Sequence, residues 1–249
     1  MKIDLQNKLA LVAEGNNDLG RAICAQLAES GAQIICLVRN DNDASQAQSY
    51  FNKAKLKVKI YDADIRDFDA CEKVIHQIKN DIGDIDIIIN NSDFSFENNF
   101  SDMTPGEWTD CMKGNLDGTY NLCRLISESM SQRGFGRIIN ISSMYGRKGA
   151  IGKSAYSASK LGLHGFTMAL AQEVARSGVT VNTISPGHIK TVQMESMPTV
   201  QANSIIADIP VARFGEAEEV ASLVDYLCSQ QASFITGTDI AINGGQYIH

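Results

Sequence analysis

The sequence predicts an α/β fold with a single, doubly wound parallel sheet and helices on both faces of that sheet. Two features indicate this class. Short runs of aliphatic residues recur along nearly the whole chain, and segments with helical periodicity separate them. Strands that are apolar on both faces, joined by crossovers of a dozen or more residues, are typical of a parallel sheet buried between helices.

The first expected strand, Leu9–Ala13, is aliphatic throughout and is followed by a helix. An apolar stripe that starts at Leu19 and continues at i+3, i+4 and i+8 indicates this helix, which should end at Gly31. Further helices are expected around residues 43–53 and 67–79, and in a long segment that follows Tyr156. Six more strands are expected at Ile34–Val38, Val58–Tyr61, Ile85–Asn90, Arg137–Ile141, Val179–Ile184 and Asp239–Ile242.

The composition limits the classes of function. A chain of 249 residues with four prolines and no visible linker or repeat favours one domain over residues 1–249. Because 22 basic residues face 29 acidic ones, the net charge of −7 argues against nucleic acid or an anionic membrane as a partner. No apolar run approaches the ~20 residues that span a bilayer. Six widely spaced cysteines without a C-x-x-C motif predict reduced thiols, no metal site and a cytoplasmic protein.

Sheets of this class bind ligands beyond the carboxyl ends of their strands, so the turn after the first strand is informative. Residues 13–22 read AEGNNDLGRA, with glycine only at Gly15 and Gly20. A dinucleotide site needs glycines here because the backbone must approach a pyrophosphate at the helix N-terminus. On its own the turn fits a phosphate cradle and a plain strand-to-helix turn equally well. Asp18 is expected to cap a helix that begins at Leu19.

The most informative stretch is Tyr156-Ser157-Ala158-Ser159-Lys160, which places a phenol and an ammonium at i and i+4 on one helix face. A nearby positive charge favours phenolate, so Lys160 is expected to lower the pKa of Tyr156 from ~10. Such a tyrosine can donate and accept protons at working pH. Two strand ends add polar residues near it: Ser142 and Ser143 after the fifth strand, and Ser185-Pro186-Gly187 after the sixth.

With these motifs the sequence resembles the short-chain dehydrogenase/reductase family over essentially the whole chain, which implies a Rossmann-type sheet. Within the family it is most similar to the acetoacetyl-CoA reductases of polyhydroxyalkanoate synthesis, and next to the 3-oxoacyl-[acyl-carrier-protein] reductases of fatty-acid metabolism. The matching residues are Asn90-Asn91, Asn115, Ser142-Ser143, Tyr156 with Lys160, and Ser185-Pro186-Gly187.

The resemblance implies a catalytic tetrad. Tyr156 would protonate a carbonyl oxygen as hydride arrives, and Lys160 would bind the nicotinamide ribose and tune the tyrosine. Ser143, thirteen residues before Tyr156 as in the family, would hydrogen-bond the carbonyl, whereas Ser142 would point to the opposite strand face. Asn115 would hold a water of a proton relay, its alternative being a helix-interior residue satisfied by backbone.

The resemblance also implies a dinucleotide site. Arg39 is the first charge after the second strand and favours NADP(H), since arginine accommodates the 2′-phosphate; a simple surface charge is the alternative. Asp64-Ile65 would contact adenine, with an ordinary turn residue as the alternative for Asp64. The expected cofactor-binding residues are Gly15, Asn17, Leu19, Arg39, Asp64, Ile65, Asn90, Tyr156, Lys160, Pro186, Gly187 and Ile189.

Three acids stand where the family has glycine: Glu14, Asp18 and Asp93. We expect all three to line the cofactor crevice, where one like charge ~5 Å from a pyrophosphate weakens binding about a hundredfold. The cost shrinks if Glu14 and Asp18 swing into solvent. The sequence therefore predicts NADPH-dependent reduction of a 3-oxoacyl thioester, the alternative being a non-catalytic member that acts by ligand binding or assembly.

Three further expectations concern other parts of the chain. The resemblance implies a homotetramer. Residues 191–209 are expected either to form a lid over the substrate or to contribute ordinary packing. His164 and His188 are expected to be structural or pocket-edge residues, because the sequence offers neither of them a serine or cysteine partner.

Overall fold

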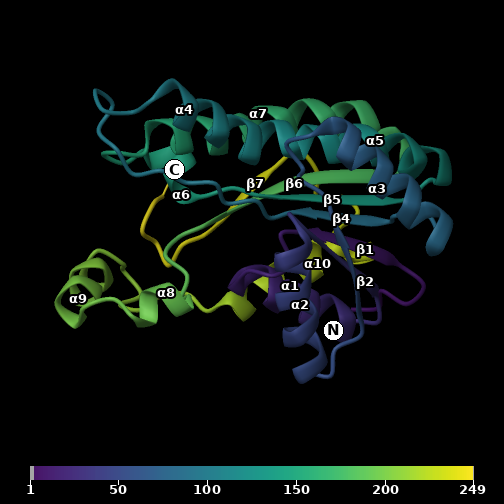
Figure 1. The fold of residues 1–249 in the computed structure, drawn as a ribbon, viewed down its shortest axis with the longest axis horizontal. Coiled ribbons are helices and arrows are strands. Elements are labelled where there is room, and N and C mark those ends of the chain that lie inside the picture. The colour runs from purple at the N-terminus through teal and green to yellow at the C-terminus, as the bar shows by residue number, and fades with distance from the viewer. Residues whose placement is uncertain (1–2, 249) are drawn as a thin grey trace.

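A computed structural model describes residues 3–248, apart from the side chains of residues 193 and 195. Its strands form one parallel sheet in the order β3-β2-β1-β4-β5-β6-β7 (Figure 1). The strand order reverses between β1 and β4, which places a ligand crevice at their carboxyl ends. The predicted doubly wound sheet is confirmed. The strands are Leu9–Ala13 (β1), Gln33–Val38 (β2), Val58–Asp62 (β3), Ile87–Asn90 (β4), Gly136–Ile141 (β5), Val179–Pro186 (β6) and Asp239–Ile242 (β7).

Helices cover both faces of the sheet (Figure 1). On one face lie α3 (Phe68–Asp81), α5 (Gly118–Arg133) and α7 (Ser154–Val174); on the other lie α1 (Asp18–Glu29), α2 (Asp41–Lys53) and α10 (Ala217–Cys228). The remaining α-helices are α4 (Pro105–Met112), α6 (Met144–Lys148), α8 (Val192–Glu195) and α9 (Thr199–Ala207). A π-helix at Lys113–Asp117 joins α4 to α5, and short 3₁₀ helices lie at Ala175–Ser177 and Gln230–Ala232. None of the helices within residues 3–248 is long and apolar enough to cross a membrane.

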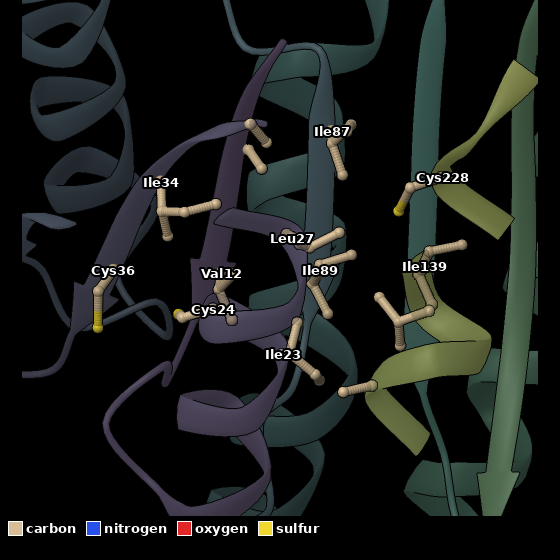
Figure 2. Packing of buried hydrophobic residues seen from close by; sticks show 14 of the residues in the cluster. Val12, Ile23, Cys24, Leu27, Ile34, Cys36, Ile87, Ile89, Ile139 and Cys228 are labelled. Atoms are coloured by element: carbon tan, nitrogen blue, oxygen red, sulfur yellow. The ribbon is translucent and has the colours of Figure 1, made fainter. Parts of the chain in front are cut away.

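The core has two layers, one on each face of the sheet. Figure 2 shows the layer under α1 and α10, where Ile23 and Leu27 of α1 meet aliphatic side chains of the central strands. The opposite layer contains side chains of α3, α5 and α7. All six cysteines are buried free thiols, which agrees with the expectation of reduced cysteines.

The fully buried Leu27 gives a test of this core. Leu27→Ala is expected to lower the free energy of unfolding by about 2–5 kcal/mol, because the truncation leaves a cavity between α1 and the sheet. Denaturant titration measures the change. Val200→Ala, at a side chain that is 85% exposed, is the matched control and should change stability by less than about 0.5 kcal/mol.

Element boundaries differ from the sequence prediction in two informative places. Helix α1 begins at Asp18, and Asn17 caps it by accepting a hydrogen bond from the Gly20 amide (2.7 Å), so the predicted Asp18 cap is wrong. Strand β4 begins at Ile87 and not at Ile85. The reason lies in Asp86, whose buried carboxylate accepts a hydrogen bond from the Leu9 amide (3.0 Å) at the edge of the ladder.

Candidate active site

The candidate site lies where β4 and β5 end and α7 begins. Lys160 on α7 is only 1% exposed, and its Nζ donates to the carbonyl oxygens of Ser92 (2.6 Å) and Ile141 (3.0 Å). The ammonium is therefore fixed between the residues that follow β4 and the last residue of β5. Its burial lowers the pKa of Lys160.

Tyr156 lies one turn before Lys160, and its ring is buried. Its hydroxyl donates a hydrogen bond to Asp93 Oδ1 at 2.7 Å. Burial, and after it the Asp93 carboxylate, raises the pKa of Tyr156 well above its usual value, while a hydrogen bond with Ser143 lowers it. The expected lowering of this pKa by Lys160 is wrong in this structure, because desolvation and a carboxylate at hydrogen-bond distance outweigh an ammonium 5.6 Å from the ring centroid.

Asp93 was expected to line the cofactor crevice, and the structure places it after β4 with its carboxylate against the Tyr156 hydroxyl. After β4 ends at Asn90, the chain turns toward α7, where Lys160 holds the Ser92 carbonyl. The next side chain, Asp93, consequently faces Tyr156, and its Oδ1 lies 3.8 Å from the Lys160 ammonium. Asp93 therefore lies at the end of the crevice that contains Tyr156 and Lys160.

The two serines after β5 have different roles. Ser143 caps α6 by accepting a hydrogen bond from the Tyr145 amide, and it contacts the Tyr156 hydroxyl. Ser142 is buried and donates to the Lys160 carbonyl (2.9 Å) on the other side of the chain. This division agrees with the expectation that Ser142 points to the opposite strand face.

The expectation that His164 lacks a serine partner is wrong. His164 Nε2 lies 2.9 Å from Ser142 Oγ, and its Nδ1 lies 3.4 Å from an Asp239 oxygen. The sequence could not show this pairing, since β5, α7 and β7 bring the three residues together only in the fold. Ser142 is buried, and the contacts among Ser142, His164 and Asp239 connect α7 to two strands of the sheet. His188 bonds Tyr145 and Gln246, as a pocket-edge residue would.

Asn115 lies in the π-helix and is almost fully buried. Its side-chain oxygen accepts from the Phe94 amide (2.9 Å), and its Nδ2 donates to the Phe94 carbonyl (2.8 Å) and to Ser159 Oγ (2.9 Å). The amide thus fixes the chain just after Asp93 against α7. The water-holding role of Asn115 stays a prediction.

The turn after β1 is closed by side chains that the sequence only partly indicated. The Asn17 side-chain oxygen accepts from Asn91 Nδ2 (3.0 Å), which also donates to the Glu14 carbonyl. A Cβ at Gly20 would lie 2.6 Å from that same carbonyl oxygen, so only glycine fits there. Asn91, a member of the Asn90-Asn91 motif, is the residue that holds the turn to the end of β4.

Glu14 and Asp18 do not both point into solvent. Glu14 has a left-handed backbone (φ 51°), and burial raises the pKa of its carboxyl, although the Arg39 charge opposes this shift. Asp18 accepts a hydrogen bond from the Val192 amide of α8 (2.9 Å). The suggestion that Glu14 escapes into water is therefore wrong, whereas Asp18 connects the turn to the segment expected to act as a lid.

The expected adenine-end residues are engaged with neighbours. Arg39 is about half exposed and lies 3.5 Å from Asp43. Asp64 binds Arg66 through both oxygens, and this guanidinium holds the pKa of Asp64 below its usual value. Ile65 belongs to the core. Their cofactor roles stay predictions.

The remaining predicted residues lie at the same edge of the sheet. Asn90 donates to Asn140 (2.8 Å) next to β5, and Leu19 packs partly buried against the core. Gly15 and Gly187 are tightly packed. A Cβ at Gly15 would lie 2.9 Å from Cys36 Sγ, and a Cβ at Gly187 would lie 2.8 Å from Asn243 Cα. Pro186 ends β6, and Ile189 forms an isolated bridge with Gly215 that directs the chain toward α8.

The segment 191–209 stands apart from the sheet (Figure 1). Helix α9 contributes no buried residue, and Met194 and Met197 are only partly buried. Ile209 at the end of the segment is buried, so packing accounts for part of it, and the lid role of residues 191–209 stays a prediction.

Comparisons with known proteins agree with this arrangement. Residues 13–246 match the family model described as Enoyl-(Acyl carrier protein) reductase. The chain is 36% identical over 245 residues to an acetoacetyl-CoA reductase of Allochromatium vinosum, covering 97% of this chain and 99% of that protein. It is 39% identical over 245 residues to the 3-oxoacyl-[acyl-carrier-protein] reductase FabG of Haemophilus influenzae, covering 98% and 100%.

A solved structure, the crystal structure of gox2181, superposes with a TM-score of 0.92 at 28% sequence identity and covers 98% of this chain and 97% of its own. Sequence and fold therefore agree over nearly the full length of the chain. The chain belongs to the short-chain dehydrogenase/reductase family.

Proposed function

We propose that this chain catalyses the NADPH-dependent reduction of a 3-oxoacyl thioester, such as acetoacetyl-CoA, to the 3-hydroxyacyl thioester. One observation carries the proposal: the Tyr156 hydroxyl, the Ser143 hydroxyl and the buried Lys160 ammonium meet at the carboxyl end of the sheet. The relatives named acetoacetyl-CoA reductase and 3-oxoacyl-[acyl-carrier-protein] reductase support the choice of substrate.

The crevice residues fit a nicotinamide dinucleotide. Two buried polar atoms at the end of β4 and just after it, Asn90 Oδ1 and Ser92 Oγ, have no hydrogen-bond partner within the described part of the chain. Lys160 has three N–H donors, of which two serve the carbonyls described above, leaving one for a ribose hydroxyl. The crowding at Gly20 keeps the first turn tight enough for a pyrophosphate to reach the N-terminus of α1.

When bound, the dinucleotide supplies hydride to the substrate carbonyl carbon. Tyr156 donates its proton to the carbonyl oxygen, and Ser143 donates a hydrogen bond to the same oxygen. The raised pKa of Tyr156 keeps the phenol protonated at neutral pH, which is the form that a reduction needs. Lys160 holds this end of the crevice in place through its two backbone contacts.

The proposal is tested by NADPH oxidation on addition of acetoacetyl-CoA to the purified full chain. Turnover with NADPH and much slower turnover with NADH are expected. Absence of turnover at about millimolar cofactor, a concentration at which even a binding energy of about 4 kcal/mol gives half-occupancy, would contradict the proposal.

Arg39 provides a test of cofactor choice. Arg39→Ala is expected to weaken NADPH binding by about 10-fold to 100-fold and to leave NADH binding nearly unchanged, because only NADPH carries the 2′-phosphate. Calorimetry with both dinucleotides measures the difference. Lys59→Ala, at an exposed cation of neighbouring β3, serves as the control. An equal loss for both dinucleotides would exclude this role of Arg39.

A second candidate, a non-catalytic member acting by ligand binding or assembly, is favoured by two observations. Glu14 places a carboxyl in the crevice, and the Asp93 carboxylate already accepts the hydrogen bond of the Tyr156 hydroxyl. Tight NADPH binding in calorimetry would remove the basis of this candidate. Either function is proposed for a cytoplasmic homotetramer, whose mass sedimentation equilibrium would measure.

A further inference from the structure

The Asp93 carboxylate lies against the group that the proposed reaction needs. Its Oδ1 accepts a hydrogen bond from the Tyr156 hydroxyl, with 2.7 Å between the two oxygens, which is within the range of strong charge-assisted bonds. The same Oδ1 lies 3.8 Å from Lys160 Nζ. A substrate carbonyl would have to accept the same proton. Carboxylate and substrate therefore compete for one hydrogen-bond donor.

The charges around this contact come from several elements. Lys160 of α7 faces both Asp93 and the Tyr156 ring, and Lys153, just before α7, lies 5.9 Å from the ring centroid. From the turn after β1, Glu14 faces Asp93 and Lys160.

Two further groups face Tyr156: the Cys111 thiol of α4 and the Ser143 hydroxyl at the start of α6. Among the carboxylates of residues 3–248, only Asp93 hydrogen-bonds the phenol, and it has the largest electrostatic effect on the pKa of Tyr156.

The two partners differ in their freedom to move. Tyr156 is 8% exposed and packs with Ala155 and Cys111. The Asp93 side chain is 61% exposed. Rotation of Asp93 into water disturbs no core contact, whereas movement of Tyr156 would open the packing around α7. Asp93 is therefore the partner that can move.

We infer that Asp93 is a positioning residue that clamps the Tyr156 hydroxyl, so that a substrate carbonyl reaches the tyrosine only after the carboxylate has turned away. The inference rests on the proposed function for its kinetic consequences. Two such consequences follow: the clamp raises KM, because the substrate must displace a hydrogen bond, and it moves the loss of the tyrosine proton to higher pH.

The test compares Asp93→Asn and Asp93→Gly with the wild type. Asparagine keeps the size of the side chain and removes its charge, and glycine is the residue of the family pattern. In both variants the alkaline limb of kcat/KM for acetoacetyl-CoA reduction is expected to fall at a pH lower by about one unit or more. KM should fall several-fold in Asp93→Gly. An unchanged limb in both variants would overturn the inference.

A substrate-free measurement separates the clamp from the reaction. The Tyr156 phenol is titrated by ultraviolet difference spectroscopy, with Tyr156→Phe identifying its contribution. The phenol is expected to ionise at lower pH in Asp93→Asn than in the wild type. Asp18→Gly removes an acid that contacts Val192 and not the tyrosine, and it should leave this titration unchanged.

The outcomes distinguish the two claims. A shifted phenol titration in a protein without turnover supports the clamp and contradicts the proposed function. Turnover with an identical phenol titration in the wild type and Asp93→Asn supports the proposed function and overturns the clamp. A shift of equal size in Asp18→Gly would likewise overturn it, since the effect would then be one of general charge.

Discussion

Replacing Tyr156 by phenylalanine is expected to reduce kcat for acetoacetyl-CoA reduction by about 10²-fold to 10⁴-fold, the usual contribution of a general acid. The hydroxyl is the only part removed, and the buried ring keeps its contacts with Ala155 and Cys111. Steady-state kinetics at saturating cofactor measures the effect. The carboxylate of Asp93 and the Ser143 hydroxyl would remain, but neither can replace a phenol held over the substrate.

Tyr120→Phe is the matched control, because Tyr120 lies half exposed on α5, away from the candidate site. Its kcat should equal that of the wild type. Stability of Tyr156→Phe should change by no more than about 1–2 kcal/mol, the range for one lost hydrogen bond. Full activity in Tyr156→Phe would remove the tyrosine from the mechanism.

Glu14→Gly is expected to tighten NADPH binding between about tenfold and a hundredfold. The variant removes a carboxyl from the crevice wall, where one like charge ~5 Å from a phosphate costs roughly 3 kcal/mol at an effective dielectric of ~20. The burial that raises the pKa of Glu14 moderates the gain, since it already disfavours the charged form of the carboxyl. Glycine also relieves the left-handed backbone at φ 51°, which adds up to about 1 kcal/mol of stability.

Two variants separate charge from backbone conformation at this position. Glu14→Gln removes the charge and keeps a side chain on the left-handed backbone, so it should gain NADPH affinity without the stability that glycine adds by relieving the backbone. The pKa of Glu14 is raised, so the carboxyl takes up its proton at higher pH than a free glutamate; lowering the pH should therefore tighten NADPH binding more in the wild type than in Glu14→Gln. Calorimetry over a pH series measures this, and parallel curves for the two proteins would contradict it.

The fold could be predicted because its signal is local. Each strand is a short aliphatic run, and each helix repeats its apolar positions along one face, as in α1. The predicted start of α1 was wrong because two neighbouring residues could each cap the helix. Asn17 and Asp18 are both good capping residues, and the extended backbone of Asn17, not its residue type, makes it the cap.

The proximity of Tyr156 and Lys160 could be predicted from the sequence, and the electrostatics around them could not. Tyr156 and Lys160 are one turn apart, so their proximity follows from helix geometry. The Asp93 contact joins residues 63 positions apart, and no spacing rule reports it. The same holds for Ser142, just after β5, and His164 on α7, which meet only after the helix packs on the sheet.

The anchoring of Lys160 has a consequence for how this sequence can change over generations. Its ammonium satisfies two backbone carbonyls in the protein interior, and an apolar replacement would strand both of them without water. Selection for a stable protein alone therefore retains the lysine, even in a descendant that has lost its substrate. The Tyr156 hydroxyl satisfies no backbone carbonyl, so stability opposes its loss less strongly, and phenylalanine would keep the packed ring.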